Sequence, residues 1–160
     1  TTMGKYPVAA VKMMAQIARE TERELPLEHR LIERGEEVKL GTDEMISYDA
    51  CHTAHQLGAV AIVALTYSGS TAQRVSKYRP KVPILAITPQ HHIVGRLSLC
   101  WGVHALQMPA PSSVTQLFTT GARLAKDLGL ARSGDLIVIT GGIPVGVAGT
   151  TNLLKVEKCP

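Results

Sequence analysis

The chain has 160 residues, of which 45% are hydrophobic and 19% are charged, and its formal net charge is +4. This composition is ordinary for one folded globular domain and does not favour an intrinsically disordered chain. Only 4% of the residues are aromatic, which argues against a stacking surface for single-stranded nucleic acid, and the mild basic excess fits a small anionic ligand better.

The hydrophobic pattern predicts helices and strands that alternate along the chain. The first helix is expected from Val8 to about Leu25, with Pro7 at its start, and a charged connection follows over residues 26–40. Thr42 is the expected N-cap of the second helix. The remaining elements are expected, in chain order, as a helix over 42–58, a strand over 60–65, a helix over 71–78, a strand over 84–88, a helix over 90–99, a strand over 103–108, a helix over 112–129, a strand over 136–140 and a strand over 152–159.

Helices between strands imply crossover connections, and strands without polar residues imply a sheet that is covered on both faces. We therefore predict an α/β fold with three layers, α/β/α, around a five-stranded mixed sheet. The last strand is expected to be antiparallel at an edge, because only about eleven residues separate it from the strand over 136–140, too few for a parallel crossover. Core positions rather than a partner groove are expected for three methionines, Met13, Met14 and Met45.

The three cysteines, Cys51, Cys100 and Cys159, are widely spaced and include no C-x-x-C pair. This spacing resembles neither a disulfide framework nor a structural zinc site. The first residues show no secretory h-region, and no apolar run approaches the ~20 residues of a membrane span. We therefore expect a cytoplasmic protein with free thiols, whose partners include no membrane and no nucleic acid.

The sequence "TYSGST" over 66–71 lies between a buried strand and a helix, and it supplies hydroxyls, a glycine and free helix N–H groups. In an open α/β sheet, ligands bind beyond the carboxyl ends of the strands where the winding reverses, so this turn and the Gly-rich loop over 141–151 are expected to converge. Arg74 and Lys77, on the helix after the turn, add candidate positive charge. The turn is not a P-loop, so phosphate binding and plain helix capping both remain open.

Candidate catalytic groups are few. Cys51 and His55 are four residues apart on an expected helix, which permits a thiolate–imidazole pair or simply an ordinary helix face. His91 and His92 are expected at the surface, and Asp135 is expected to be a turn residue rather than an acid or base. No complete active site and no metal site can be assembled from the sequence.

Three collinear stretches, 4–14, 66–88 and 134–156, resemble the C-terminal part of pyruvate kinase in its bacterial form. The resemblance covers essentially the whole chain. It implies a five-stranded mixed sheet of order 3-2-1-4-5, a connecting helix over 1–25 that follows a catalytic barrel, and the C-terminal α/β domain over 26–160. Because Thr1 stands where a motif at the end of the barrel would finish, we expect a fragment of a longer protein rather than a stand-alone protein that binds phosphorylated metabolites. The extent of the reading frame upstream of Thr1 distinguishes these two alternatives.

The resemblance also implies a function. The family transfers a phosphoryl group from phosphoenolpyruvate to ADP, giving pyruvate and ATP, with Mg and K as cofactors. The barrel's lysine, metal-binding carboxylates and substrate loops have no counterpart in this chain, so it is expected to be inactive alone, with no catalytic residue, metal or cofactor of its own. Its expected role is that of a regulatory and subunit-contact domain whose partners are its own catalytic barrel, further copies in a homo-oligomer (a homotetramer in the family) and a phosphorylated effector.

Two groups of residues correspond to the family's effector site. The expected phosphate ligands are Thr66, Ser68, Gly69, Ser70 and Thr71. The expected loop over the effector contains Gly146, Val147, Ala148, Gly149 and Thr150.

This chain departs from the animal enzymes that respond to fructose 1,6-bisphosphate. Those carry Lys and Arg where this chain has Tyr67 and Ser70, and Trp and Arg where it has Gly142 and Ile143. Because fewer fixed cations surround the site, the resemblance favours a monophosphate effector, a sugar monophosphate or AMP.

Overall fold

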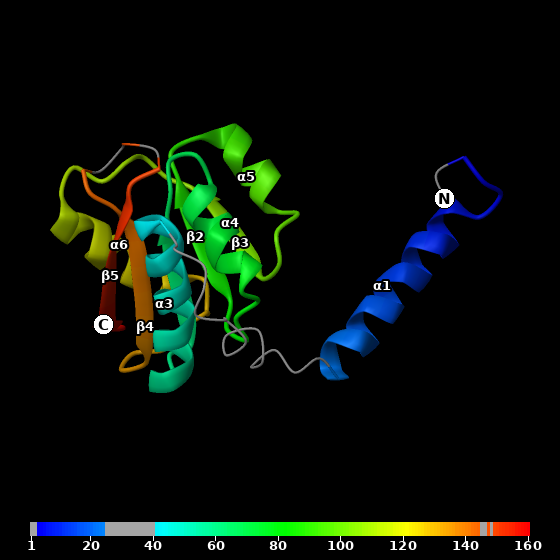
Figure 1. The fold of residues 1–160 in the computed structure, drawn as a ribbon, viewed down its shortest axis with the longest axis horizontal. Helices are drawn as coiled ribbons and strands as arrows, with labels where there is room; N and C mark the ends of the chain where they lie inside the picture. The colour runs from blue at the N-terminus through cyan, green and yellow to red at the C-terminus, as the bar shows by residue number, and fades with distance from the viewer. Residues whose placement is uncertain (1–2, 25–40, 145–146, 148) are drawn as a thin grey trace.

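A computed structural model describes residues 3–24, 41–144, 147 and 149–160 of the chain (Figure 1). Its elements, in chain order, are α1 (Pro7–Glu24), α3 (Thr42–Leu57), β1 (Ala61–Leu65), α4 (Ser70–Lys77), β2 (Ile84–Thr88), α5 (His91–Leu97), β3 (Val103–Gln107), α6 (Val114–Asp127), β4 (Leu136–Gly142) and β5 (Thr151–Lys158).

The strands form one five-stranded mixed sheet in the order β3-β2-β1-β4-β5. β1 pairs in parallel with both β2 and β4, and β3 extends the parallel part beyond β2. β5 pairs antiparallel with β4, with Val138 opposite Val156. The predicted strand order and the antiparallel last strand are thus confirmed.

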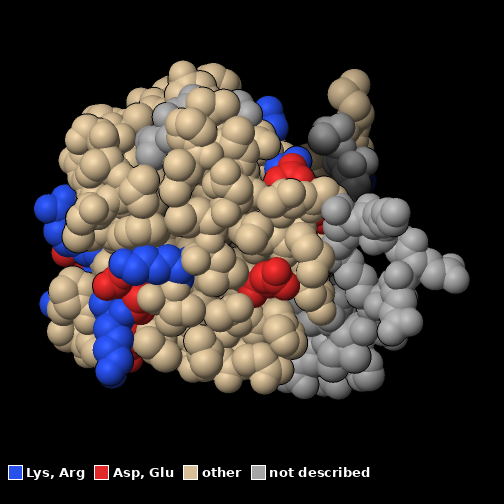
Figure 2. Space-filling view, turned by 60° about the vertical axis from the view of Figure 1, so that its left-hand side comes forward, with Lys and Arg blue, Asp and Glu red and all other residues tan. Residues whose placement is uncertain are grey.

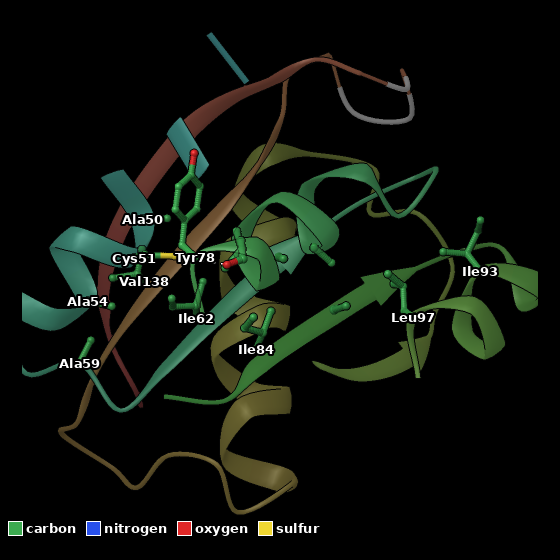
Figure 3. Packing of buried hydrophobic residues seen from close by; sticks show 14 residues of the cluster. Ala50, Cys51, Ala54, Ala59, Ile62, Tyr78, Ile84, Ile93, Leu97 and Val138 are labelled. Atoms are coloured by element: carbon green, nitrogen blue, oxygen red, sulfur yellow. Dashed lines mark hydrogen bonds between the residues drawn. The ribbon is translucent and has the colours of Figure 1, made fainter. Parts of the chain in front are cut away.

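Helices cover both faces of the sheet, which gives the predicted three layers (Figure 1). On one face, α3, α4 and α5 pack over alternate residues of β1 and β2, such as Ile62 and Ile84, and over Val138 of β4 (Figure 3). On the other face, α6 packs over the intervening residues, including Val63 and Ile139. Both faces of β1 are therefore buried, and each fully buried aliphatic side chain contributes roughly 1.5–3 kcal/mol.

Two helix starts show how local capping refines the predicted boundaries. Ser113 is the N-cap of α6, and its hydroxyl accepts a hydrogen bond from the N–H of Gln116 at 3.2 Å. Thr42, in contrast, was wrongly predicted as a cap: it is the first residue of α3, and Gly41 stands at the N-cap without a side-chain hydrogen bond. Gly58 ends α3 in the left-handed conformation that terminates many helices.

The prediction that the methionines lie in the core is wrong, because Met13, Met14 and Met45 are all exposed. Two of them belong to α1, which extends away from the sheet (Figure 1) and also exposes Val11 and Ile17. The boundary predicted between residues 25 and 26 lies outside the described residues.

Charged side chains on the face in Figure 2 occur as neighbouring acids and bases rather than as a continuous basic patch. This mixed distribution gives that face no electrostatic footprint for nucleic acid. Among the described helices, none is both long and apolar enough to cross a membrane.

The close approach of α6 to the sheet gives a stability prediction. A Cβ atom on Gly121 would lie 3.1 Å from Val63 Cγ1, whereas a Cβ on Gly95 of α5 would meet nothing within 4 Å. We expect Gly121→Leu to lower the free energy of unfolding by at least about 1–3 kcal/mol through overpacking. Gly95→Leu should leave that free energy unchanged or raise it by up to about 1 kcal/mol through helix propensity. Urea unfolding of both variants is the measurement, and equal effects would contradict the packing described for α6.

Candidate functional site

The predicted anion turn follows β1 directly and begins α4. Gly69 is the N-cap of α4 and has a φ of +87°, a conformation that side chains other than glycine rarely adopt. A Cβ there would also lie 3.1 Å from Ile93 Cγ2 and 3.4 Å from Leu97 Cδ2 of α5. Two independent constraints therefore require glycine at this position.

The backbone of the turn leaves donors at the start of α4. The hydroxyl of Thr66 accepts a hydrogen bond from the N–H of Gly69 at 2.9 Å, which fixes the curvature of the turn. The carbonyl of Gly69 accepts the first hydrogen bond of the helix, from the N–H of Gln73 at 3.0 Å. Helix geometry therefore leaves the N–H groups of residues 70–72 without an intrahelical acceptor. Such groups carry the positive end of the helix dipole and suit an anion.

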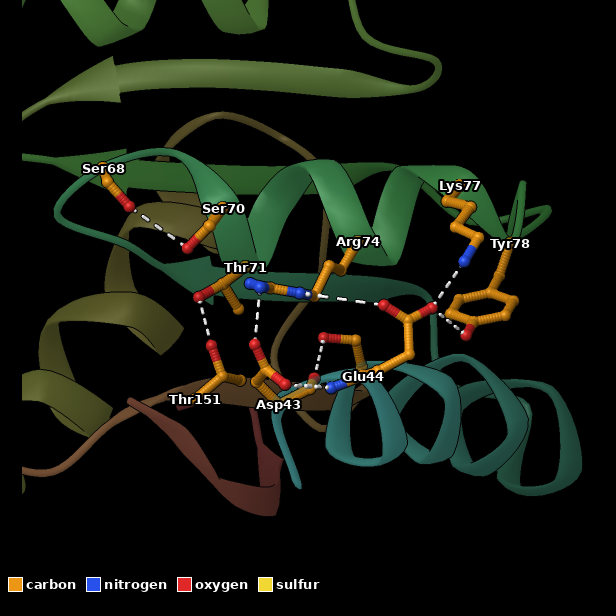
Figure 4. A network of polar contacts seen from close by, with 10 residues as sticks. Asp43, Glu44, Ser68, Ser70, Thr71, Arg74, Lys77, Tyr78 and Thr151 are labelled. Atoms are coloured by element: carbon orange, nitrogen blue, oxygen red, sulfur yellow. Dashed lines mark hydrogen bonds and ion pairs between the residues drawn. The ribbon is translucent and has the colours of Figure 1, made fainter. Parts of the chain in front are cut away.

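The hydroxyls of the turn divide into two sets (Figure 4). Ser68 and Ser70 are half-buried, and their Oγ atoms lie 3.1 Å apart in a hydrogen bond. Thr71 is buried, and its Oγ1 lies 2.6 Å from Oγ1 of Thr151 at the start of β5. The two serines therefore remain partly accessible, whereas Thr71 connects α4 to the end of the Gly-rich loop.

The Gly-rich loop begins where β4 ends. The side chain of Asn152 closes it by accepting a hydrogen bond from the N–H of Ile143 at 2.9 Å and donating one to the carbonyl of Ile143 at 2.8 Å. The hydroxyl of Thr150 donates to the carbonyl of Val147 at 3.0 Å. A Cβ on Gly142 would lie 2.5 Å from Oγ1 of Thr150, so this loop conformation excludes a larger residue there. Two residues of the expected effector loop, Gly146 and Ala148, lie outside the described residues.

The two loops converge at the carboxyl edge of the sheet, as predicted. The hydrogen bond between Thr71 and Thr151 joins them directly. At the same edge, on the face of the sheet that α6 covers, lies an apolar crevice of about 50 Å³ that residues of both loops help to line. Its lining residues are Leu65, Thr66, Tyr67, Ile87, Pro89, Met108, Pro109, Ala110, Pro111, Leu117 and Gly142.

The two cations on α4 are bound by carboxylates of α3 (Figure 4). Arg74 Nη2 lies 2.5 Å from Asp43 Oδ2, and Lys77 Nζ lies 2.7 Å from Glu44 Oε1. The hydroxyl of Tyr78 also donates to Glu44 Oε1. The sequence analysis did not find this network, because Asp43 and Glu44 looked only like first-turn acids that favour a helix start. No local pattern indicates that α3 packs beside α4.

The other candidate groups do not form an active site. Cys51 is buried, and its thiol donates to the carbonyl of Val75 at 3.6 Å. Burial raises the pKa of this thiol from 9.0 to about 12, so near neutral pH Cys51 is a neutral thiol and does not supply the thiolate that a pair with His55 would need. His91 and His92 are exposed, as predicted, and Asp135 accepts a hydrogen bond from the N–H of Arg132 across a turn. Within the described parts of the chain, no group of three or more His, Cys, Asp or Glu side chains could hold a metal ion.

Comparison with known proteins gives a consistent result. The family model described as pyruvate kinase, alpha/beta domain, matches residues 44–157. The pyruvate kinase of Clostridium acetobutylicum is 42% identical to this chain over 154 residues, and that of Geobacillus stearothermophilus is 44% identical over 159 residues. These matches cover 96% and 98% of this chain but 33% and 27% of those proteins. The chain therefore spans between about a quarter and a third of the length of the curated relatives it matches.

The burial of Cys51 gives a prediction about thiol chemistry. Its folded pKa lies above the ordinary value of 9.0, so the stability that its neutral form contributes is complete below pH 9 and is lost as the pH rises toward 12. At pH 8 the raised pKa reduces the thiolate fraction, and hence the reaction with an aromatic disulfide reagent, by about a thousandfold. We expect the half-buried Cys100 to react first with this reagent in the folded chain and so to give the fast phase of the reaction. Cys100→Ala should therefore remove that phase, and loss of the phase in Cys51→Ala instead would contradict this assignment.

Proposed function

The chain belongs to the pyruvate kinase family, of which it is the C-terminal alpha/beta domain, and on this premise we propose that it binds the phosphate of an allosteric effector at the turn over 66–71. The observation that carries the proposal is the donor set at the start of α4. Three backbone N–H groups without intrahelical acceptors lie beside the paired hydroxyls of Ser68 and Ser70. Charge-assisted hydrogen bonds from such fixed donors contribute roughly 1.5–3 kcal/mol each.

The charge around the turn favours a single phosphate. Neither Tyr67 nor Ser70 carries a positive charge, and the ammonium group of Lys77 is held by Glu44 on α3. A second phosphate would need cations that the described residues do not place there. We therefore propose a sugar monophosphate or AMP as the effector class.

The effector would act on a longer protein. We propose that the phosphoryl transfer for which the relatives are named belongs to that longer protein and uses a catalytic barrel that α1 connects to this domain. Val11 and Ile17 on α1 are exposed, which supports a covering partner for this helix. A cytoplasmic location is part of the same proposal.

A second proposed role is contact between subunits through β5. β5 is an edge strand, and Val156 on it is exposed. The N–H of Cys159 donates to the carbonyl of Asp135 at 2.8 Å, so the two-residue period of an antiparallel ladder directs the N–H of Glu157 toward β4 and that of Val156 outward. Outward N–H and C=O groups allow the same strand of another copy to pair across a two-fold axis.

The phosphate site gives a binding prediction. Ser68→Ala removes one hydroxyl donor and should weaken effector binding about tenfold or somewhat more. Ser70→Asp should weaken it further, because its carboxylate would occupy the place of the anion, while a carboxylate at a helix start does not destabilise the helix. Isothermal titration calorimetry against AMP, ribose 5-phosphate, glucose 6-phosphate and fructose 1,6-bisphosphate measures these effects. Equal affinities in the three proteins would mean that the turn is only a helix cap, and a preference above tenfold for the bisphosphate would refute the monophosphate proposal.

The edge strand gives a prediction about assembly. Val156→Pro removes an outward donor without removing a hydrogen bond to β4, so it should dissociate the oligomer and leave the fold intact. Glu157→Pro is the matched control, since it removes a hydrogen bond inside the sheet and should instead lower the free energy of unfolding. Sedimentation velocity and thermal unfolding distinguish the two variants. Monomeric behaviour of the unsubstituted chain, or no change with Val156→Pro, would argue against pairing through β5.

A further inference from the structure

Arg74 lies one helical turn after the phosphate-binding turn, and its side chain runs back toward that turn. Long side chains on an α-helix lean toward its N-terminus and cover the preceding turn. Figure 4 shows the guanidinium group of Arg74 reaching along α4 toward Thr71. The charged end of this residue is therefore close to the start of α4, although its Cα is not part of the turn.

Two carboxylates of α3 occupy one edge of this guanidinium group. Nη2 lies 2.5 Å from Asp43 Oδ2, and Nε lies 3.7 Å from Glu44 Oε2. Nη1 remains: it is buried and has no hydrogen-bond partner among the described residues. Buried polar nitrogens nearly always have an acceptor, and a charged donor without one costs more than a neutral donor does.

We propose that Arg74 is a further phosphate ligand, whose Nη1 donates to the effector phosphate at the turn over 66–71. This inference rests on the proposed function and adds a specificity-determining cation to its neutral donors. A phosphate oxygen supplies the acceptor that Nη1 lacks, and a guanidinium group binds phosphate well because it offers donors in a fixed planar arrangement. One cation at the turn also matches one phosphate group.

Asp43 weakens this cation while holding it in place. Its carboxylate neutralises part of the charge of Arg74 and keeps the guanidinium group against α3. Removing the charge of Asp43 should therefore raise the affinity for phosphate, whereas removing Arg74 should lower it. If Arg74 served only to bridge α3 and α4, the two changes would act in the same direction, because each breaks the same ion pair.

Lys77 provides the matched control. It is on the same helix and shares one acidic partner, Glu44, with Arg74, but its side chain is 63% exposed and lies one turn farther from the phosphate site. Lys77→Gln removes one positive charge without removing the proposed donor. Its effect on binding measures the contribution of net charge alone.

The experiment is isothermal titration calorimetry of the 160-residue chain against AMP, ribose 5-phosphate and inorganic phosphate. We expect Arg74→Gln to weaken binding of the two phosphate esters about tenfold or more and to reduce the dependence of binding on salt. Lys77→Gln should change binding less than about threefold, and Asp43→Asn should tighten it. Urea unfolding of each variant identifies any loss caused by unfolding, since only folded protein is compared.

The outcomes separate this inference from the proposed function. Equal affinities of Arg74→Gln and Lys77→Gln, or equal weakening by Arg74→Gln and Asp43→Asn, would overturn the role of Arg74 even if Ser70→Asp abolished binding and so supported the phosphate site. If the unsubstituted chain bound none of the three compounds, both the site and the role of Arg74 would be wrong.

Discussion

The pairing of β1 with β4 at the centre of the sheet is the constraint on which the candidate site depends. These two strands run in parallel from Ala61 opposite Ile137 to Ala64 opposite Thr140, and helices bury both faces of β1. Because the strands are parallel, both must end at the same edge, and the segments that follow them lie side by side. The hydrogen bond between Thr71 and Thr151 then fastens the two segments together. A core held by nondirectional apolar contacts thus fixes the position of a polar site that contributes little to that core.

The electrostatics of the site are set by a neighbouring helix rather than by the turn itself. Two carboxylates at the start of α3 bind both cations of α4, so most donors at the turn are neutral hydroxyls and backbone N–H groups. Neutral donors bind an anion more weakly than several fixed cations would, so the proposed effector would bind reversibly. The same ion pairs connect α4 to α3. A displacement of α4 would therefore also displace the charged side chains at the start of α3, the helix at which the matched domain begins.

Several features follow from short stretches of sequence alone. The apolar β-branched runs identify the central strands, and the short connection after β4 excludes a parallel crossover, so β5 must be antiparallel. Glycine at positions 58 and 69 marks left-handed conformations at the ends of helices. The three methionines were wrongly predicted to lie in the core, because an apolar helix face indicates that it is covered but does not identify the segment or partner that covers it. On α1 the described residues include no such cover for Met13 and Met14.

The sequence by itself therefore determined the fold class and the turn with its hydroxyls, because these depend on backbone conformation and hydrophobic period over a few residues. The strand order followed from the resemblance of the sequence to a known family. Only the tertiary structure decided which partner each polar side chain has. Arg74 meets Asp43, Thr71 meets Thr151 across 80 positions of the chain, and Cys51 is buried against Val75 instead of paired with His55. These contacts depend on how helices and strands distant in sequence pack together, and a hydrogen bond or ion pair forms only when that packing brings two groups within about 3 Å of each other.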